Sequence, residues 1–513
     1  MAIRRVPLAV WILSALLQAG CAAGLPRPGG EFRVGIESTP GTLDPRYAAD
    51  VHAVRILPLL FHGLLAPEPT GAFRLDLAER WERPDPLTHV FRLRAGVRFH
   101  DGTELTARDV VATYRYVMDP ANGCPGSGAL EPVASVEADG PRTVVFRLKR
   151  LYVSFPFQLT LGILPERLAR QRDLGDRVVG TGPFRLAAFR PGEELVLEAF
   201  PDHFGGDAVL GRVRFRIVSN ATTRLLEIRS GGLDLLQNAV PPYAVKFLRR
   251  DPELRVIVAP GSSYQYLGYN LEDPVLSDVR VRRAISYAID RKTLIDFALA
   301  GLARPATGLL PPEHWAYNAD VPVYPYDPER ARRLLDEAGF PDPDGPGPAV
   351  RFRLSYKTST DKTALEVAHL IAAQLRRVGI GVEVRSFEWG TFFSDVRKGN
   401  FQLMSLRWIG IRDPDAFHYL FHSASVPPRG ANRGRYRNPR VDAWIEQSRR
   451  TLDREERRRL YGRVQEALAR DCVYTSLWWL DNVVVIRRGF RGFTPLPGGE
   501  YTSLAFVRPE GGP

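Results

Sequence analysis

The segment from Val350 to Val384 constrains the fold most, because its pattern is that of a strand, a helix and a second strand. Apolar residues alternate with polar ones from Val350 to Tyr356 and again from Ile380 to Val384. Between these runs one helical face is apolar, and Gly379 ends the predicted helix. Such a unit implies parallel strands with a right-handed crossover, and a ligand crevice beyond the carboxyl ends of the strands. The pattern therefore predicts an α/β protein.

Two further segments predict amphipathic helices. From Val281 apolar residues recur at i, i+3, i+4, i+7 and i+8, which predicts one helix over 279–295 with Asp278 as its N-cap. A second helix begins at Asp327-Pro328, a capping residue followed by proline, and ends at Gly339. The N-terminal third differs, since Asp-Gly pairs at 101–102 and 139–140 lie among β-rich runs and predict hairpins.

The first residues predict an export signal. Arg4 and Arg5 precede a short apolar run from Val6 to Leu17, which is well below the roughly 20 residues needed to span a bilayer. The run is followed by Gln18-Ala-Gly-Cys21, and this small-small-Cys ending resembles a bacterial lipobox, except that Gln18 replaces the usual aliphatic residue. We expect a signal peptide over 1–20, acylation of Cys21 and a tether over 21–30. The alternative is ordinary cleavage nearby.

Charge and cysteine content exclude two classes of protein. The formal net charge of +12 suggests a nucleic-acid-binding protein. Against this, the arginines are spread along the whole chain, and the export signal indicates a protein outside the cytoplasm. Three cysteines in a chain of this size do not form a disulfide framework. If Cys21 carries lipid, Cys124 and Cys472 remain; their pairing cannot be deduced from sequence, and we expect Cys472 to be a buried free thiol.

Six segments, in order along the chain, resemble the family 5 extracellular solute-binding proteins, which include the dipeptide-, oligopeptide- and nickel-binding components of ABC importers. They are GTLDP (41–45), FRLRAGVRFHDGTELTARDVV (91–111), GTGPF (180–184), YNLEDPVLSDVRVRRAISYAID (269–290), YDPERARRLLDEAGF (326–340) and NPRVDAWI (438–445). The resemblance implies a type II periplasmic-binding-protein fold, with two α/β lobes and an extra subdomain in the first. By position, lobe I covers 31–260 plus 485–513 and lobe II covers 261–484. Hinge strands are expected near 263–269 and 480–484.

The function that the resemblance implies is that of a substrate-binding lipoprotein. The protein would capture a peptide-like or other small solute between its lobes and deliver it to the permease subunits of an ABC importer. It would lie in the periplasm or on the outer face of the cell membrane, without a cofactor and without enzymatic activity. Two alternatives remain open at this point: an exported hydrolase on a similar fold, and a ligand receptor for a sensor.

The expected ligand site centres on the segment after residue 407. Trp408 and Gly410 match the family's Trp-x-Gly segment at the cleft, where the indole would form a pocket wall; the alternative is a core tryptophan. In peptide-binding members an aspartate that pairs with the ligand's α-ammonium group follows directly. Here that position is Ile411, and the next carboxylates are Asp413 and Asp415. The resemblance therefore implies a ligand other than a free dipeptide, with Asp413 as the nearest substitute.

Other candidate residues lie at strand ends. Tyr269 and Asn270 end the first hinge strand, where Asn270 either holds a backbone turn or contacts ligand. The arginine that dipeptide binders use for the ligand carboxylate falls near Thr358, which leaves Lys357 as the closest cation. The loop residues Asp44 and Thr181 have no assigned role beyond turn formation.

Catalytic and metal sites are not expected. The sequence contains no nucleophile-elbow serine, no HExxH and no phosphate-binding glycine loop, and His100-Asp101 belongs to a predicted turn. His418 and His422 stand at i, i+4 spacing and could ligate a metal on one helix face. Because no cysteine or carboxylate cluster lies near them in sequence, we expect helix packing instead and predict no metal site.

Overall fold

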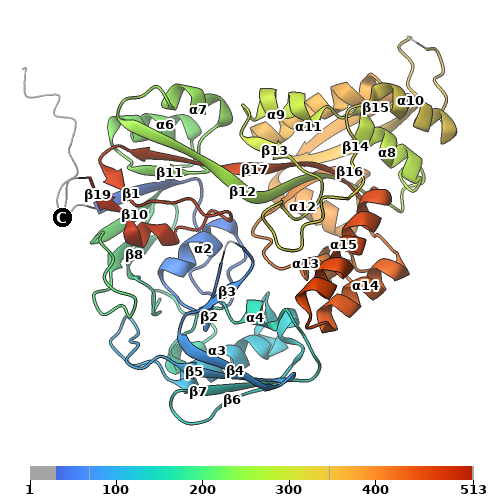
Figure 1. The fold of residues 1–513 in the computed structure, drawn as a ribbon. Coiled ribbons are helices and arrows are strands. Elements are labelled where there is room, and N and C mark those ends of the chain that lie inside the picture. The colour runs from blue at the N-terminus through green and yellow to red at the C-terminus, as the bar shows by residue number, and fades with distance from the viewer. Residues whose placement is uncertain (1–30, 69, 346, 511–513) are drawn as a thin grey trace, which may run out of the picture.

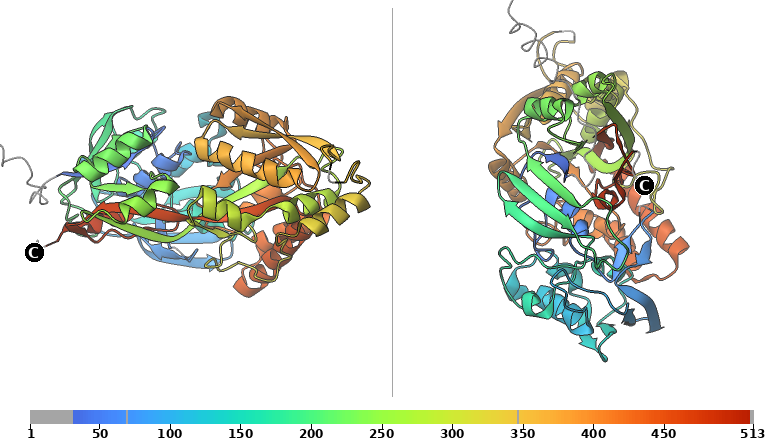
Figure 2. Two further views of the ribbon diagram at one scale, coloured as in Figure 1. Left: turned by 90° about the horizontal axis from the view of Figure 1, so that it is seen from above. Right: turned by 90° about the vertical axis from the view of Figure 1, so that its left-hand side faces the viewer.

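The computed structural model describes residues 31–510 except 69 and 346, so the predicted signal peptide, Cys21 and the tether lie outside the described residues. An 11-stranded sheet runs through both lobes in the order β15-β14-β16-β12-β17-β11-β1-β10-β9-β8, with β13 paired to β17. Its two longest strands, β12 (Leu254–Tyr269) and β17 (Tyr474–Arg487), are antiparallel and pass from one lobe into the other (Figures 1 and 2).

Lobe I is built on the N-terminal strand. β1 (Glu31–Ile36) lies between β10 (Arg212–Ile217) and β11 (Leu235–Gln237) and is parallel to both. The side chains of Phe32 and Val34 on β1 are fully buried, in a core that also includes C-terminal residues such as Leu504. The remaining elements of this lobe are β8 (Phe184–Arg190), β9 (Glu194–Ala199), α2 (Val51–Ile56), α5 (Glu166–Ala169), α6 (Ala221–Ser230), α7 (Pro242–Leu248), β18 (Phe490–Arg491), β19 (Arg508–Pro509) and the 3₁₀ turns Leu57–Leu59 and Thr502–Phe506.

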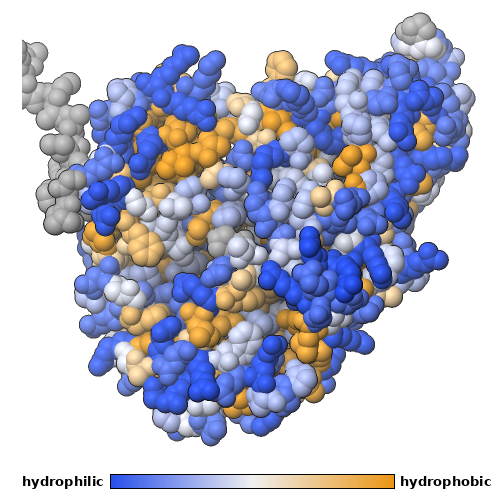
Figure 3. Space-filling view, in the orientation of Figure 1, coloured by the Kyte–Doolittle hydropathy of each residue, from blue (hydrophilic) through white to orange (hydrophobic). Residues whose placement is uncertain are grey.

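Lobe II confirms the predicted strand-helix-strand unit. β14 (Phe352–Ser359) and β15 (Ile380–Phe387) are parallel and α11 (Lys362–Arg376) joins them. Gly379, at φ +85°, ends the connection as predicted. The other elements are β13 (Ala303–Pro305), β16 (Leu403–Trp408), α10 (Pro328–Glu337), α12 (Trp389–Lys398), α13 (Ala416–Phe421), α14 (Pro439–Arg450) and α15 (Arg454–Arg470). Hydrophilic residues cover α14 and α15 on the face drawn in Figure 3.

The prediction of a single helix over 279–295 is wrong. The structure has two helices, α8 (Val279–Ala288) and α9 (Arg291–Ala298), and Ile289 between them is extended. Asp290 accepts a hydrogen bond from the Thr293 amide at 3.0 Å and caps α9. A capping aspartate competes with the continuing helix for backbone donors, which explains the break. Asp278 and Asp327 cap α8 and α10 as predicted.

An antiparallel subdomain projects from lobe I, at the bottom of Figure 1. Its sheet has the order β4-β5-β7-β6, and α3 packs on it with a hydrophobic core of its own. The predicted hairpin turns at Gly102 and Gly140 are present, both at positive φ. The elements here and beside it are β2 (Leu65–Pro67), β3 (Phe73–Leu75), β4 (Ala78–Asp85), β5 (Thr88–Leu93), α3 (Ala107–Met118), β6 (Val133–Ala138), β7 (Thr143–Leu148), α4 (Phe155–Gln158) and the 3₁₀ turns Pro120–Asn122 and Ser127–Leu130.

The register between β12 and β17 shifts between Ala259 and Ser263, next to the predicted lobe boundary at 260/261. The boundaries themselves stay a prediction. Among the described residues, no helix combines the length and the apolar character needed to cross a bilayer.

Candidate functional site

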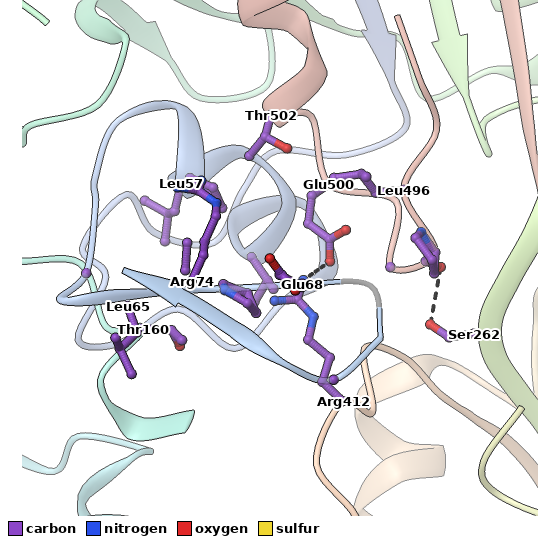
Figure 4. Close-up of a pocket in the computed structure, with 18 of the residues that line it drawn as sticks. Leu57, Leu65, Glu68, Arg74, Thr160, Ser262, Arg412, Leu496, Glu500 and Thr502 are labelled. Atoms are coloured by element: carbon purple, nitrogen blue, oxygen red, sulfur yellow. Dashed lines mark hydrogen bonds and ion pairs between the residues drawn. The ribbon is translucent and has the colours of Figure 1, made fainter. Parts of the chain in front are cut away.

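A cavity of about 390 Å³ lies between the lobes, within the range typical of small-ligand pockets. Lobe I supplies the β2–β3 hairpin, the end of α2 with the turn after it, residues 160–162 and the C-terminal residues 496–502. Lobe II supplies residues 311–314 and 411–412, and the hinge strand β12 supplies 260–262. Figure 4 shows side chains from these distant segments pointing into one space. A ligand held there would contact both lobes.

An ion pair crosses the cavity. Arg412 of lobe II pairs with Glu500 of the C-terminal segment (Figure 4). The Glu500 side chain is buried, whereas that of Arg412 is about one-third exposed. Beside them, the Ser262 hydroxyl donates to the Pro497 carbonyl at 3.2 Å, which attaches the hinge strand to the same C-terminal segment. These contacts hold the two lobes together beside the cavity.

The tip of the β2–β3 hairpin reaches across to lobe II. Gly71 has φ +80°, and a Cβ there would lie 3.1 Å from Trp315 and 3.3 Å from the Arg412 carbonyl. That carbonyl also accepts a hydrogen bond from His314 Nε2 at 3.0 Å. Burial lowers the pKa of His314, so its imidazole is neutral and the contact is fixed in one tautomer. The backbone of Arg412 is therefore held independently of its side chain.

Two motifs of the expected family lie close to the cavity, since Pro45 of GTLDP lines it and GTGPF packs against residues 59–61. A Cβ at Gly182 would lie 2.3 Å from the Leu59 carbonyl, so the GTGPF glycine allows two backbones to approach closely. Asp44 of GTLDP accepts hydrogen bonds from Arg46 at 2.9 and 2.6 Å, and both side chains are buried. Thr181 is fully buried. Asp44 is thus a buried structural partner of Arg46.

A second group of charges lies at the end of β16. Arg407 is exposed to solvent, yet its pKa is lowered, first by desolvation and then by Arg55 of lobe I. Asp361 of lobe II and Glu37 of lobe I oppose this shift. The charged groups that act on the Arg407 pKa thus come from both lobes. Arg55 donates through Nε to the carbonyl of Gly498, which lines the cavity, so the two charged regions adjoin.

Of the residues predicted to bind ligand, Ile411 lines the cavity. Trp408 is half-buried against the lobe II core, with its ring stacked 6.3 Å from that of Tyr266. The guanidinium of Arg433 lies 4.4 Å from the centre of the Trp408 ring. Gly410 adopts φ +70° with open space where a Cβ would be. The structure thus places Trp408 beside the cavity segment, and its role in ligand binding stays a prediction.

Asp413 lies on the other side of this segment, against α13. One carboxylate oxygen accepts a hydrogen bond from the Asp415 amide at 2.7 Å. Burial, and then the neighbouring Asp415 charge, raise the pKa of Asp413 to about 7. Asp415 itself accepts from the Tyr152 hydroxyl at 2.9 Å and pairs with Arg449 at 2.9 Å. Asp413 does not belong to the described residues that line the cavity.

The remaining predicted residues lie within lobe II. Tyr269 is fully buried, and its hydroxyl forms a hydrogen bond with the hydroxyl of Thr475. Asn270 donates to the Gly399 carbonyl at 3.2 Å and so holds a turn. Lys357 pairs with Asp395 at 2.6 Å, and Thr358 is buried. The cavity lining, as far as the chain is described, includes none of these four. A contact between them and a ligand stays a prediction.

Sequence reasoning missed Arg407, Arg412 and Glu500. The two arginines flank the Trp-x-Gly segment, so an inspection of its neighbours could have found them. Glu500 lies in the C-terminal tail without a periodic pattern or motif, and only the fold brings it to Arg412.

The expectation that no carboxylates accompany His418 and His422 is wrong. Glu446 of α14 faces both imidazoles and Asp442 faces that of His422, because α13 packs against α14 in the folded chain although the two pairs are far apart in sequence. By contrast, the prediction for Cys472 is confirmed: it is free and buried, and Cys124, for which no state was predicted, is free and buried as well. Burial raises the pKa of Cys472 to about 11, which leaves its thiol unreactive at neutral pH.

Known proteins share this architecture. Residues 72–427 match the family model described as bacterial extracellular solute-binding proteins, family 5 Middle. The oligopeptide-binding protein AppA of Bacillus subtilis is 27% identical, covering 92% of this chain and 90% of its own. Protein XP55 of Streptomyces lividans is 31% identical, covering 93% and 89%. The solved structure of AppA with a nonapeptide superposes with a TM-score of 0.82 at 25% identity, covering 94% of this chain and 100% of the other.

These similarities confirm the predicted family and the two-lobed periplasmic-binding-protein fold with an extra antiparallel subdomain. They also exclude the hydrolase alternative, because this is a family of non-enzymatic binding proteins. The chain belongs to the bacterial extracellular solute-binding proteins, family 5, and is the solute-binding component of an ABC transporter.

Proposed function

We propose that this protein binds a peptide-like solute, longer or more modified than a free dipeptide, in the cavity between its lobes and delivers it to an ABC permease. The observation that carries the proposal is the cavity itself, which takes its lining from both lobes and from the hinge strand β12. A ligand that contacts both lobes favours the closed arrangement by its differential affinity for it.

The chemistry of the cleft supports a peptide-like ligand. The cavity lining offers cations at Arg74 and Arg412 and carboxylates at Glu68 and Glu313. A zwitterionic chain with amide groups complements such a mixture of charges. The similarity to AppA, an oligopeptide-binding protein solved with a nonapeptide, supports the same class.

The position of Ile411 argues against free dipeptides. Ile411 lines the cavity where peptide-binding relatives are expected to place an aspartate, and the nearest substitute, Asp413, is turned toward Asp415. A buried ammonium group without a partner is costly, and a hydrogen bond to a charged group contributes about 1.5–3 kcal/mol. We therefore expect dipeptides to bind no tighter than about micromolar.

A thermal-shift screen of dipeptides, tripeptides and peptides up to nine residues tests the proposal. A ligand at a hundredfold excess over its Kd stabilises the folded state by about 2.7 kcal/mol. Solution scattering of the same samples should show a smaller radius of gyration if the lobes close. Nanomolar binding of several unmodified dipeptides would contradict the ligand class. Stabilisation by none of the longer peptides would contradict a peptide ligand altogether.

The proposal includes a lipid anchor at Cys21, outside the described residues. Acyl chains contribute about 0.8 kcal/mol per buried CH₂, and two or more chains hold a protein stably on a membrane. Cys21→Ser should release the protein from the membrane fraction into the soluble fraction. A wild-type protein that is already soluble after lysis would contradict the anchor and leave the ligand proposal untouched.

A further inference from the structure

Two helices of lobe II bring two histidines and two carboxylates together outside the cavity. His418 lies on α13 and His422 ends it, one turn apart, and their rings stack with centroids 4.7 Å apart. Asp442 and Glu446 lie one turn apart on α14, on the side that faces α13. Three of these residues, His418, His422 and Glu446, each offer one ligand atom, and the three atoms lie within 4.8 Å of one another.

The separations distinguish a metal site from hydrogen bonding. Glu446 Oε1 lies 3.4 Å from His418 Nε2 and 3.7 Å from His422 Nε2, and Asp442 Oδ1 lies 3.9 Å from His422 Nε2. Hydrogen bonds from N–H to oxygen are about 2.7–3.2 Å long, so these contacts are too long. A tetrahedral zinc ion separates its nitrogen and oxygen ligands by roughly 3.3–3.5 Å. The donors of His418, His422 and Glu446 therefore lie around a space of the size that such an ion fills, and Asp442 Oδ1, which accepts from the Ser423 amide at 2.9 Å, lies beside His422 as a fourth donor.

The charges around the cluster suit a metal. The carboxylates of Asp442 and Glu446 can offset the charge of a divalent ion. Arg449 and Arg450 approach Glu446 at 3.6 and 3.5 Å, which is loose pairing that an ion can displace.

His422 needs one adjustment. Its Nδ1 accepts a hydrogen bond from the Ala424 amide at 3.1 Å. With a metal at Nε2 the ring proton lies on Nδ1, where it would face the Ala424 N–H, so the two donors must move apart. Ala424 is exposed, so water can replace the lost partner.

We propose that His418, His422, Glu446 and Asp442 bind one divalent transition-metal ion of the zinc type. Imidazole with carboxylate is a donor set for zinc, copper or nickel, whereas magnesium and calcium prefer oxygen alone. The ion would join α13 to α14. Helix α13 begins at Ala416, a few residues after Ile411 and Arg412. The bound ion would therefore also fix the segment that places these two residues in the cavity lining.

Zinc titration of tag-free protein, stripped with EDTA and competed against a chromogenic zinc chelator, tests the site. We expect one zinc per chain with a Kd at or below micromolar. Glu446→Gln preserves side-chain size and should weaken binding by at least about tenfold. His418→Ala/His422→Ala should abolish binding, and circular dichroism would confirm that the variant is folded.

A matched control uses the other close histidine pair. His62 Nε2 and His203 Nε2 lie 3.1 Å apart beside the cavity. His62→Ala/His203→Ala should bind zinc as the wild type does. Three results would overturn the proposal: no stoichiometric zinc on the wild type, zinc retained by the His418/His422 variant, or zinc lost with the His62/His203 variant instead.

Discussion

The two sides of segment 411–415 differ in how they manage charge. On the cavity side, Arg412 pairs with Glu500 of the opposite lobe. On the other side, Asp413 and Asp415 lie together, and Asp413 has a pKa raised to about 7. The first arrangement consists of opposite charges on two bodies that a hinge can separate. The second consists of like charges buried in lobe II, where Asp415 also accepts from Tyr152 of the extra subdomain of lobe I. Lobe closure should therefore affect the Arg412–Glu500 pair and the Tyr152–Asp415 contact, and leave the repulsion between Asp413 and Asp415 unchanged.

The largest expected effect comes from Asp413→Asn. A carboxyl whose folded pKa is raised from 3.8 to about 7 binds more protons in the folded state than in the unfolded state between these values. The free energy of unfolding therefore falls as pH rises from about 4 to about 7. The asparagine variant should be more stable than the wild type at pH 8, by on the order of 3 kcal/mol, and equal to it near pH 4.

Urea unfolding of both proteins at pH 5, 6.5 and 8 measures this difference. Asp415 is present in both proteins, and the asparagine of the variant keeps the shape of the Asp413 side chain without its charge. A difference in unfolding free energy that does not grow with pH would show that Asp413 is ionised in the folded state, and the contrast between the two sides would fail.

The second effect concerns Arg412→Ala. The variant leaves the buried Glu500 carboxylate without its partner, which should lower the unfolding free energy by about 2 kcal/mol. Glu500→Gln in the same chain should recover part of the loss, and a double-mutant cycle gives the coupling. If the pair holds the lobes, solution scattering of Arg412→Ala should show a larger radius of gyration. Unchanged scattering would mean that the pair does not restrain the hinge.

The third effect concerns Tyr152→Phe. Burial raises the pKa of Tyr152 well above its ordinary value, so the hydroxyl remains a donor to Asp415. Removal of this hydrogen bond should cost about 1.5 kcal/mol. Since the bond joins lobe I to lobe II, its loss should also favour the open arrangement and weaken a confirmed ligand. An unchanged Kd, measured by calorimetry, would show that this contact does not help to hold the lobes closed.

Local patterns in the sequence predicted the secondary structure better than the cavity. The unit from β14 to β15 was predicted because strand alternation and helical spacing lie in one contiguous stretch. The helix over 279–295 was predicted wrongly because its apolar spacing continues through Ile289, while the capping preference of Asp290 prevails. Glu500 and the Asp442–Glu446 pair could not be found from sequence, since only the tertiary fold places them beside Arg412 and the histidines.

The smallest effect, and the sharpest test of the comparison, is Gly410→Ala. Gly410 adopts φ +70°, and a Cβ there meets nothing within 4 Å, so the cost is conformational alone, about 1 kcal/mol. Gly102 has φ +84° with equally open space in the extra subdomain, so Gly102→Ala should cost the same. Because Gly410 precedes Ile411 and Arg412 directly, its substitution should also weaken a confirmed ligand, whereas that of Gly102 should not. Equal ligand affinity in both variants, measured by calorimetry beside urea unfolding, would show that the cavity does not depend on the backbone of segment 410–412.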